Sequence, residues 1–291
     1  MLLKDIEQIF LKELSDVMPL EEIKTAFAWL MEDYCGLARF ALVMDPGYTV
    51  DKPTETLFFN ALSQLKEGEP LQYVLGYASF LGDVYDLNRA TLIPRPETEE
   101  LVEWAALFLN ELGAAESMQH PPLHILDVGT GSGCIATQLA KQFPESVVKA
   151  IDYSPEALQM ARVNADKLGV RVDFLQEDVL GEHWKHQTKY HLIVSNPPYV
   201  LESEAESMAT RVKEYEPYAA LFVSDEDPLI FYRAIALFAK QHLYPGGGLY
   251  FEINALKEAP LLSLLKEMGF TGIESKADFR GKARFIRAQI P

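Results

Sequence analysis

The stretch that decides the fold is an apolar run ending in a glycine-rich turn, Ile125-Leu126-Asp127-Val128-Gly129-Thr130-Gly131-Ser132-Gly133. Glycine has no Cβ, so such a turn can adopt positive φ and let the backbone approach a ligand closely. We expect a helix directly after it, and the first N–H groups of a helix have no partner within the helix. Strand, turn and helix together predict a binding site for a nucleotide-like cofactor.

The spacing of the glycines indicates which cofactor. A dinucleotide fingerprint, G-x-G-x-x-G, would need a glycine at Cys134, and no G-x-x-x-x-G-K-[ST] phosphate loop occurs. An acid, Asp127, instead precedes a G-x-G-x-G run. This pattern resembles the first motif of class I methyltransferases, which use S-adenosylmethionine (SAM) and release S-adenosylhomocysteine. In such a site backbone N–H groups meet the SAM carboxylate, and Asp127 takes up the amino group.

Around this loop, from about residue 96, expected strands alternate with expected helices, which is typical of a doubly wound α/β sheet. The expected strands are Leu123–Val128, Val147–Asp152, Val172–Leu175, His191–Ser195 and Gly248–Ile253. The expected helices are Gly133–Gln142, Pro155–Leu168 and Pro228–Lys240. Residues 270–290 predict a closing antiparallel pair of strands. We therefore expect a class I methyltransferase domain over residues 96–291.

Two further acids stand at the ends of expected strands. Asp152 ends the second strand, where a carboxylate can accept hydrogen bonds from two ribose hydroxyls. Asp178 follows the third strand and can accept from the adenine amino group, while Val179 packs on the ring. The predicted cofactor-binding residues are Asp127, Gly129, Thr130, Gly131, Ser132, Gly133, Asp152, Asp178 and Val179.

The fourth expected strand runs into Asn196-Pro197-Pro198-Tyr199. Prolines fix the backbone and carry no N–H, so the carbonyls of Asn196 and Pro197 are held as rigid acceptors. The Asn196 side-chain oxygen and the flat Tyr199 ring complete a predicted clamp for a planar group that bears an NH2. Two acceptors would hold the poorly nucleophilic nitrogen in line with the methyl sulfonium and favour its pyramidal form in the transition state. A merely rigid loop is the alternative interpretation, and the neighbouring cofactor loop favours the clamp.

The first 77 residues predict a separate helical domain. Apolar residues recur there at helical spacing, and Pro19, Pro46-Gly47 and Pro53 supply breaks. The stretch Phe80–Leu87 predicts a hairpin. We expect a hairpin linker at residues 78–95 between this domain and the methyltransferase domain.

The balance of acidic and basic residues indicates which kind of macromolecule the chain binds. The chain has 43 acids and 26 bases, a formal net charge of -17. This balance disfavours non-specific nucleic-acid binding, which needs clustered bases, and would attract a basic protein. Only two cysteines occur, and no apolar run approaches the roughly 18–20 residues of a membrane span. We expect a cytoplasmic protein that contacts no membrane and holds no metal, with His183 and His186 as surface residues.

Several motifs support a resemblance to a known family. The Asn-Pro-Pro-Tyr sequence resembles that of methyltransferases acting on exocyclic or amide NH2 groups, either in nucleic acids or in release factors. Residues 92–102, which contain Pro94-Arg95-Pro96-Glu97-Thr98-Glu99, closely resemble the opening of the catalytic domain in the release factor glutamine methyltransferase (PrmC/HemK) family. Residues 70–82 and Tyr215-Glu216-Pro217 also resemble that family. The likeness covers about 70–291 in motifs, and residues 1–69 in size alone.

The resemblance implies methyl transfer to the side-chain amide nitrogen of the glutamine in the Gly-Gly-Gln motif of class I release factors. It also implies that residues 1–77 form the N-terminal substrate-binding domain. We further expect a monomer. Two departures occur: Asn254 stands where family members usually carry glycine, and residues 223–228 lack the usual glycines. An adenine-N6 methyltransferase is the alternative enzyme, which the charge disfavours. A non-catalytic SAM-binding scaffold is the alternative of another class, which the intact clamp disfavours.

Overall fold

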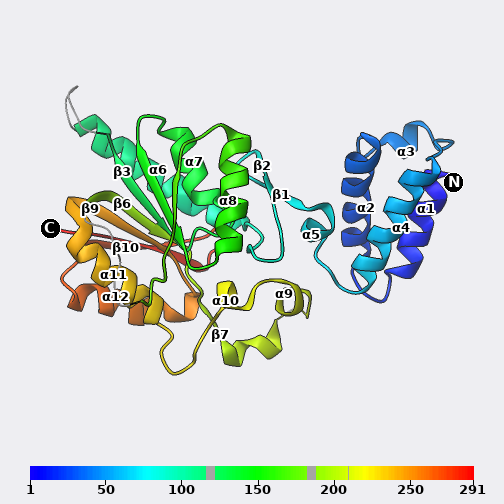
Figure 1. Ribbon diagram of the computed structural model, residues 1–291. Helices are drawn as coiled ribbons and strands as arrows, with labels where there is room; N and C mark the ends of the chain where they lie inside the picture. Colours follow the sequence, from blue (N-terminus) through cyan, green and yellow to red (C-terminus); the bar gives the residue numbers. More distant parts are fainter. Residues whose placement is uncertain (116–121, 182–187, 209) are drawn as a thin grey trace. The chain divides into compact units, whose positions relative to one another are not determined.

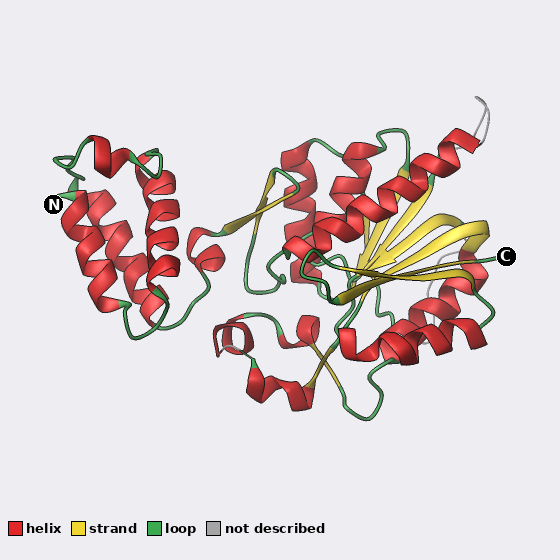
Figure 2. Cartoon of the chain, turned by 180° about the vertical axis from the view of Figure 1, so that it is seen from behind, coloured by secondary structure: helices red, strands yellow, loops and turns green. Residues whose placement is uncertain are grey.

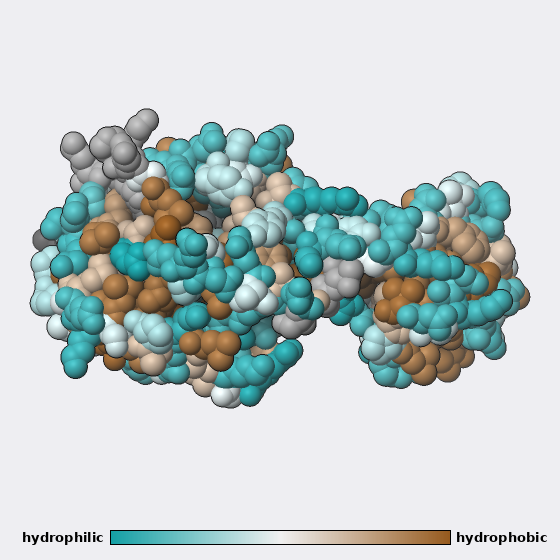
Figure 3. All heavy atoms as spheres, turned by 90° about the horizontal axis from the view of Figure 1, so that it is seen from below, coloured by the Kyte–Doolittle hydropathy of each residue, from teal (hydrophilic) through white to brown (hydrophobic). Residues whose placement is uncertain are grey.

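The computed structural model describes residues 1–115, 122–181, 188–208 and 210–291. The chain forms two compact units. One unit comprises Met1–Tyr77 together with α9 (Thr210–Tyr215), and the other comprises the rest of the described chain. On the face drawn in Figure 3, hydrophilic side chains are interspersed with smaller apolar groups. Among the described residues, no helix combines the length and the apolar character that a membrane crossing requires.

The smaller unit is helical, as its apolar spacing predicts. Its remaining helices are α1 (Leu3–Glu13), α2 (Leu20–Cys35), α3 (Ala41–Met44), α4 (Lys52–Lys66) and α5 (Leu71–Leu75) (Figure 1). Phe27 lies at the centre of its core, with ring centroids 5.2 Å from Phe10 and 5.4 Å from Phe58. Pro53 lies in the first turn of α4, where its missing N–H costs nothing, and Asp51 caps that helix by accepting from the Thr54 N–H. Pro53 therefore starts a helix rather than only ending one.

The larger unit is built on one seven-stranded sheet. From one edge to the other its strands are β10 (Thr271–Ala277), β11 (Ala283–Gln289), β9 (Leu243–Glu252), β6 (Tyr190–Ser195), β3 (His124–Val128), β4 (Val147–Asp152) and β5 (Asp173–Gln176). Strands β9 to β5 are parallel, whereas β11 pairs antiparallel with both β9 and β10. Because β3 lies between β4 and β6, the chain order reverses there. Ligands of open α/β sheets bind outside the carboxyl ends of strands at such a point.

Helices cover both faces of this sheet (Figures 1 and 2). One face carries α6 (Pro96–Ala115), α7 (Cys134–Gln142) and α8 (Pro155–Leu168), and the other carries α11 (Ile230–His242) and α12 (Glu258–Glu267). Each face has its own apolar cluster, so the strands are buried on both sides. This double burial explains the nearly continuous apolar runs of β3 and β6. The doubly wound, Rossmann-like class and the closing antiparallel pair are both confirmed.

Most element boundaries lie close to the predictions, and β4 and α8 have the predicted bounds. The largest shift is in β9, which begins at Leu243 rather than Gly248. Leu243 pairs with Tyr190 and Gly248 pairs with Leu192, so a bulge in β9 accommodates the intervening glycines. The helices α6 and α12 are additions to the predicted set.

A hairpin precedes the sheet, as predicted. It consists of β1 (Tyr77–Phe80) and β2 (Asp83–Asp86), which pair with each other. Leu81 and Gly82 form its turn with φ of 48° and 80°, the signs of the primed turn that suits twisted strands. After β6 the chain forms shorter elements: β7 (Val200–Leu201), η1 (Glu202–Ser207), α10 (Tyr218–Leu221), β8 (Phe222–Val223) and η2 (Ala255–Lys257).

Candidate active site

A cavity of about 470 Å³ lies within the larger unit, at the carboxyl ends of β3, β4 and β6. Most of the residues singled out from the sequence meet there. Those lining the cavity are Gly129, Gly131, Asp152, Asp178, Val179, Asn196, Pro197 and Pro198. Those outside the lining are Asp127, Thr130, Ser132, Gly133 and Tyr199. Of the second set, Asp127 braces the glycine-rich turn, and Tyr199 is bonded to the buried Glu252.

The glycine-rich turn has the backbone that its composition predicts. Gly129, Gly131 and Gly133 have φ of 73°, 55° and 82°, all in the region that side chains disfavour. A Cβ on Gly133 would lie 3.0 Å from the Cβ of Ala161 on α8, so a side chain there would push the helix away. The Gly131 N–H donates to Asp152 Oδ2 at 2.8 Å, which ties the turn to the end of β4. The backbone can therefore come close to a ligand in the cavity.

Asp127 lies beneath the turn and is fully buried. Its Oδ2 accepts from the Thr130 hydroxyl at 2.6 Å and from the Ala136 N–H at 3.2 Å, so it braces the turn and the start of α7. Its Oδ1 has no hydrogen-bond partner among the described residues. Burial raises the pKa of this carboxyl from 3.8 to about 7. A buried carboxylate oxygen without a donor is the kind of group that an ammonium would satisfy.

The two other acids lie on the cavity wall. Asp152 also accepts from the Ser154 N–H at 3.0 Å through Oδ1, and burial raises its pKa. Asp178 Oδ1 accepts from the Leu180 N–H at 2.9 Å, and Val179 packs against the apolar cluster beneath α11. Each carboxylate is held by backbone donors, and each retains acceptor capacity toward the cavity.

The clamp residues Asn196, Pro197 and Pro198 also line the cavity. We call these three residues the substrate wall, and we call the glycine-rich turn with Asp152 and Asp178 the cofactor wall. The Asn196 side-chain NH2 donates to the Thr98 hydroxyl at 3.2 Å. Tyr199 is directed away from the cavity, because its hydroxyl donates to the buried Glu252 at 3.0 Å. Burial is also the main reason that the pKa of the Tyr199 hydroxyl is raised. Tyr199 thus fixes the clamp from behind in this structure.

The Pro94–Glu99 motif at the start of α6 makes contacts with several distant parts of the chain. Arg95 donates to Glu216 Oε1 at 2.5 Å, and the Ile93 N–H donates to the other oxygen of that carboxylate at 3.3 Å. The motif thereby meets Tyr215-Glu216-Pro217, although 121 positions separate Arg95 from Glu216. Thr98 donates to Glu252 at 2.7 Å, and Glu99 accepts from the Leu81 N–H in the hairpin turn. The start of α6 therefore joins the clamp, the hairpin and the cavity wall.

Sequence reasoning missed Glu252, which ends β9 and is 1% exposed. A signal existed, because a lone acid at the end of a fully apolar strand needs partners. The Asn254 departure also has a physical reason. Its φ of -72° requires no glycine, and its side chain donates to the Tyr199 carbonyl at 3.2 Å and to Glu204 at 3.0 Å. Asn254 therefore helps to fix the segment that follows the clamp.

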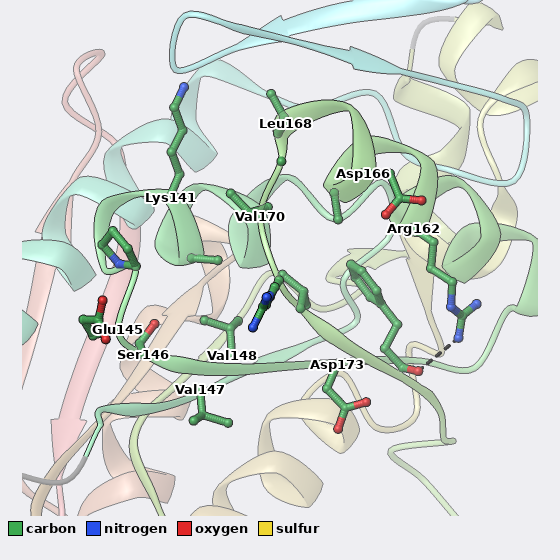
Figure 4. Close-up of a pocket in the computed structure, with 17 residues that line it drawn as sticks. Lys141, Glu145, Ser146, Val147, Val148, Arg162, Asp166, Leu168, Val170 and Asp173 are labelled. Carbon is green, nitrogen blue, oxygen red and sulfur yellow. Dashed lines mark hydrogen bonds between the residues drawn. The ribbon is translucent and has the colours of Figure 1, made fainter.

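A larger hollow of about 1240 Å³ lies at the opposite, amino-terminal end of β5, between α7 and α8 (Figure 4). Two of its cations have other partners: Arg162 donates to the Phe174 carbonyl at 3.0 Å, and Lys141 pairs with Asp83 at 2.5 Å. No glycine-rich turn or proline clamp borders it. We therefore place the candidate active site in the smaller cavity.

Among the described residues, no three His, Cys, Asp or Glu side chains gather as they would around a metal ion. His183 and His186 lie outside the described residues, so the prediction that they are surface residues stays a prediction.

Comparisons with known proteins show the family to which the chain is similar. Residues 104–213 match the family described as Methyltransferase small domain, and residues 11–76 match the PrmC N-terminal domain. A release factor glutamine methyltransferase from Flavobacterium psychrophilum is 40% identical over 290 residues, covering 100% of both chains. Another, from Bacteroides thetaiotaomicron, is 38% identical and covers 95% of this chain and 96% of that protein.

Solved structures that resemble the chain share its fold. The human METTL16 catalytic domain in complex with an RNA hairpin has a TM-score of 0.53 at 15% identity, covering 85% of this chain and 86% of that one. The Thermus thermophilus 16S rRNA N2 G1207 methyltransferase, in complex with AdoMet and guanosine, has a TM-score of 0.50 at 18% identity, covering 74% and 50%. At this identity the likeness concerns the fold alone.

Proposed function

The chain belongs to the family of release factor glutamine methyltransferases, and from that premise we propose how its residues perform the reaction. The reaction moves a methyl group from SAM to the side-chain amide nitrogen, N5, of the glutamine in the Gly-Gly-Gln motif of class I release factors. The observation that carries the assignment is that one cavity is lined by the glycine-rich turn, by two acids and by the proline clamp.

The cofactor wall suits SAM in size and in chemistry. A cavity of about 470 Å³ is typical of small-molecule sites, which span roughly 300–1,000 Å³. Asp152 accepts from the ribose hydroxyls, Asp178 accepts from the adenine amino group, and Val179 packs on the ring. Backbone N–H groups of Gly129–Gly133 meet the carboxylate, and Asp127 Oδ1 is the acceptor for the ammonium. SAM supplies an electrophilic methyl group, and S-adenosylhomocysteine leaves as the product.

The substrate wall holds and orients the glutamine. The Asn196 NH2 is used by Thr98, so its Oδ1 is available to one amide N–H of the substrate. The Pro197 carbonyl accepts the other, and Pro198 keeps that carbonyl rigid. As the nitrogen forms its new bond it becomes pyramidal and gains positive charge, which both acceptors stabilise more than they stabilise the flat amide. The methylated nitrogen then loses one of its protons to solvent water. Because an N-protonated amide is a strong acid, we propose no residue as a strong base.

We also propose a role for each domain of the chain and the kind of partner that it binds. Residues 1–77 act as the domain that binds the release factor, 78–95 as a hairpin linker and 96–291 as the methyltransferase domain. The surplus of acids over bases supports a basic protein partner rather than nucleic acid. We further propose a cytoplasmic monomer that uses no metal.

The test incubates the purified protein and methyl-labelled SAM with unmodified release factor, and separately with unmethylated duplex DNA. We expect label on the factor, and none on a factor whose Gly-Gly-Gln glutamine is replaced. Label on DNA alone would replace the proposal with the adenine-N6 alternative. SAM binding without label on either substrate would favour the scaffold alternative.

A further inference from the structure

A buried chain of hydrogen bonds ends at the clamp asparagine. It runs from Glu252 to Thr98 at 2.7 Å and from Thr98 to the Asn196 side chain at 3.2 Å. Thr98 is 3% exposed and Glu252 is 1% exposed, so water does not compete for these bonds. The three residues come from α6, from the end of β9 and from the end of β6, and they converge from distant parts of the sequence.

The chemistry of the carboxylate fixes the direction of every bond in this chain. An ionised carboxylate can only accept, and Glu252 accepts from both the Thr98 and the Tyr199 hydroxyls. The Thr98 hydroxyl has one proton, which is used on Glu252, so toward Asn196 it can only accept. Asn196 must then present its NH2 to Thr98. The Asn196 Oδ1 is therefore not used by Thr98 and is available as an acceptor.

Burial raises the pKa of Glu252, and three neighbours oppose that rise by favouring the charged, accepting form. Arg284 lies close enough to attract the carboxylate, and Arg284 is itself held by Asp278 at 3.4 Å. The Tyr232 hydroxyl donates to the Glu252 backbone carbonyl at 3.1 Å, which fixes the end of the strand. The three neighbours that favour the charged carboxylate are the Thr98 and Tyr199 hydroxyls, which donate to it, and Arg284.

We propose that Thr98 and Glu252 are positioning residues, which hold the Asn196 amide with its oxygen toward the substrate. This inference rests on the proposed function. The nitrogen of a glutamine NH2 can only donate hydrogen bonds. If the Asn196 amide were flipped, its own NH2 would face the substrate, and two donors cannot bond to each other. The orientation therefore selects substrates that present an NH2 and disfavours those that present an acceptor. Neither residue touches the reacting atoms in this account.

The first test compares Thr98→Val with Thr98→Ser. Valine has nearly the shape of threonine without the hydroxyl, whereas serine keeps the hydroxyl and loses the methyl group. We expect Thr98→Val to lower kcat about tenfold or more, because the asparagine loses its orientation. The Kd for SAM and the KM for the release factor should stay within about twofold of their values in the unmodified enzyme, since neither depends on the orientation of the Asn196 side chain alone. Thr98→Ser should keep kcat within about threefold of the unmodified enzyme.

A second readout does not depend on activity. In protein labelled with 15N at asparagine, the Asn196 side-chain resonance is assigned by its loss in Asn196→Asp. We expect its Nδ2 protons to exchange slowly with solvent in the unmodified protein and in Thr98→Ser, and faster in Thr98→Val. This measurement tests the hydrogen-bond chain even if the release factor proves not to be the substrate, so the two failures are distinguishable.

Two results would overturn the inference. One is an Asn196 exchange rate in Thr98→Val equal to that of the unmodified protein. The other is an equal loss of kcat in Thr98→Val and Thr98→Ser with a matching fall in Tm, because that pattern would mean that Thr98 serves packing alone. Glu252→Gln supplies a check on direction. Its amide can turn NH2 toward Thr98 and permit the reversed asparagine, so kcat should fall while the Kd for SAM stays within about twofold.

Discussion

The two walls of the cavity are held in different ways. On the cofactor wall the bonds are short in sequence: Asp127 bonds to Thr130, three positions away, and to Ala136, nine positions away. On the substrate wall they are long, since Asn196 and Thr98 are 98 positions apart and Thr98 and Glu252 are 154 apart. The glycine-rich turn is braced within a single strand–turn–helix segment, with one tie to Asp152 at the end of the next strand. The substrate wall exists only once α6, β6 and β9 have come together.

This difference predicts how the two walls respond to change. A substitution on the cofactor wall should weaken SAM binding and leave the clamp intact. A substitution in the clamp, or in the residues that support it, should lower kcat and leave the affinity for SAM unchanged. The variants of Asn196 and Asp152 test this separation directly, and those of Asp127 and Glu216 test how single groups hold the cavity.

The largest effect is expected for Asn196→Ala. Removing the side-chain acceptor should lower kcat about 10²- to 10³-fold, as loss of a donor or acceptor aimed at the transition state does elsewhere. The Kd for SAM should remain within about twofold, measured by isothermal titration calorimetry. Asn110→Ala, on the exposed side of α6, is the control and should match the unmodified protein. A comparable loss of SAM affinity in Asn196→Ala would contradict the separation of the walls.

Asp127→Asn tests the buried acid beneath the glycine-rich turn. The pKa of Asp127 is about 7 in the folded protein against 3.8 ordinarily, so between these values the folded state holds a proton that the unfolded state has lost. Wild-type stability should therefore fall as pH rises from about 4 to 7, by at most about 4 kcal/mol from this group. Asparagine carries no such charge, so the stability of the variant relative to wild type should improve as pH rises.

Urea denaturation of both proteins at pH 4.5 and pH 8 measures this difference, and the other acids cancel between them. A stability gap that does not change with pH would mean that Asp127 titrates normally. The variant should also bind SAM more weakly, because Asp127 Oδ1 no longer offers a negative acceptor to the ammonium.

Asp152→Ala should weaken SAM binding by about 10- to 100-fold, because two hydrogen bonds to a charged acceptor are lost. At saturating SAM, kcat should recover to within a few-fold of the unmodified enzyme. Asp173→Ala is the matched control, since Asp173 is an exposed acid at the opposite end of the sheet, where β5 begins. A kcat that stays low at saturating SAM would show that the walls are not independent.

The smallest effect is expected for Glu216→Gln. Glutamine can still accept from the Ile93 N–H, but Arg95 loses its ion pair. Arg95 is about one third exposed, so solvent screens much of the lost attraction, and we expect a destabilisation of about 1 kcal/mol. Thermal unfolding measures it, with the exposed Glu226→Gln as the control. An unchanged Tm would show that this pair contributes little to the cavity wall.

The same contrast explains how far the sequence could predict the structure. The glycine-rich turn, the alternating strands and helices and the closing antiparallel pair follow from local pattern, and all are confirmed. The bulge in β9 did not follow, because it depends on the register with β6. Local pattern also placed Asn196, Asp152 and Asp178 near strand ends, and the sheet order brings them to one cavity.

The supports of the clamp could not be predicted in this way. Nothing near Thr98 in the sequence indicates that its hydroxyl meets Glu252, because that contact depends on where α6 crosses the end of β9. The resemblance of residues 92–102 to a known family marked the segment as special without saying why. The direction that Tyr199 faces is another such case, since it is set by the buried Glu252 rather than by its own neighbours.

The most direct test of the central claim is to locate the methyl group by tandem mass spectrometry. Unmodified release factor is incubated with SAM and either the wild-type enzyme or Asn196→Ala. The account predicts one methyl group on the side-chain amide of the Gly-Gly-Gln glutamine with the wild-type enzyme, and almost none with the variant at equal SAM occupancy. A methyl group at any other residue, or equal modification by both enzymes, would contradict it.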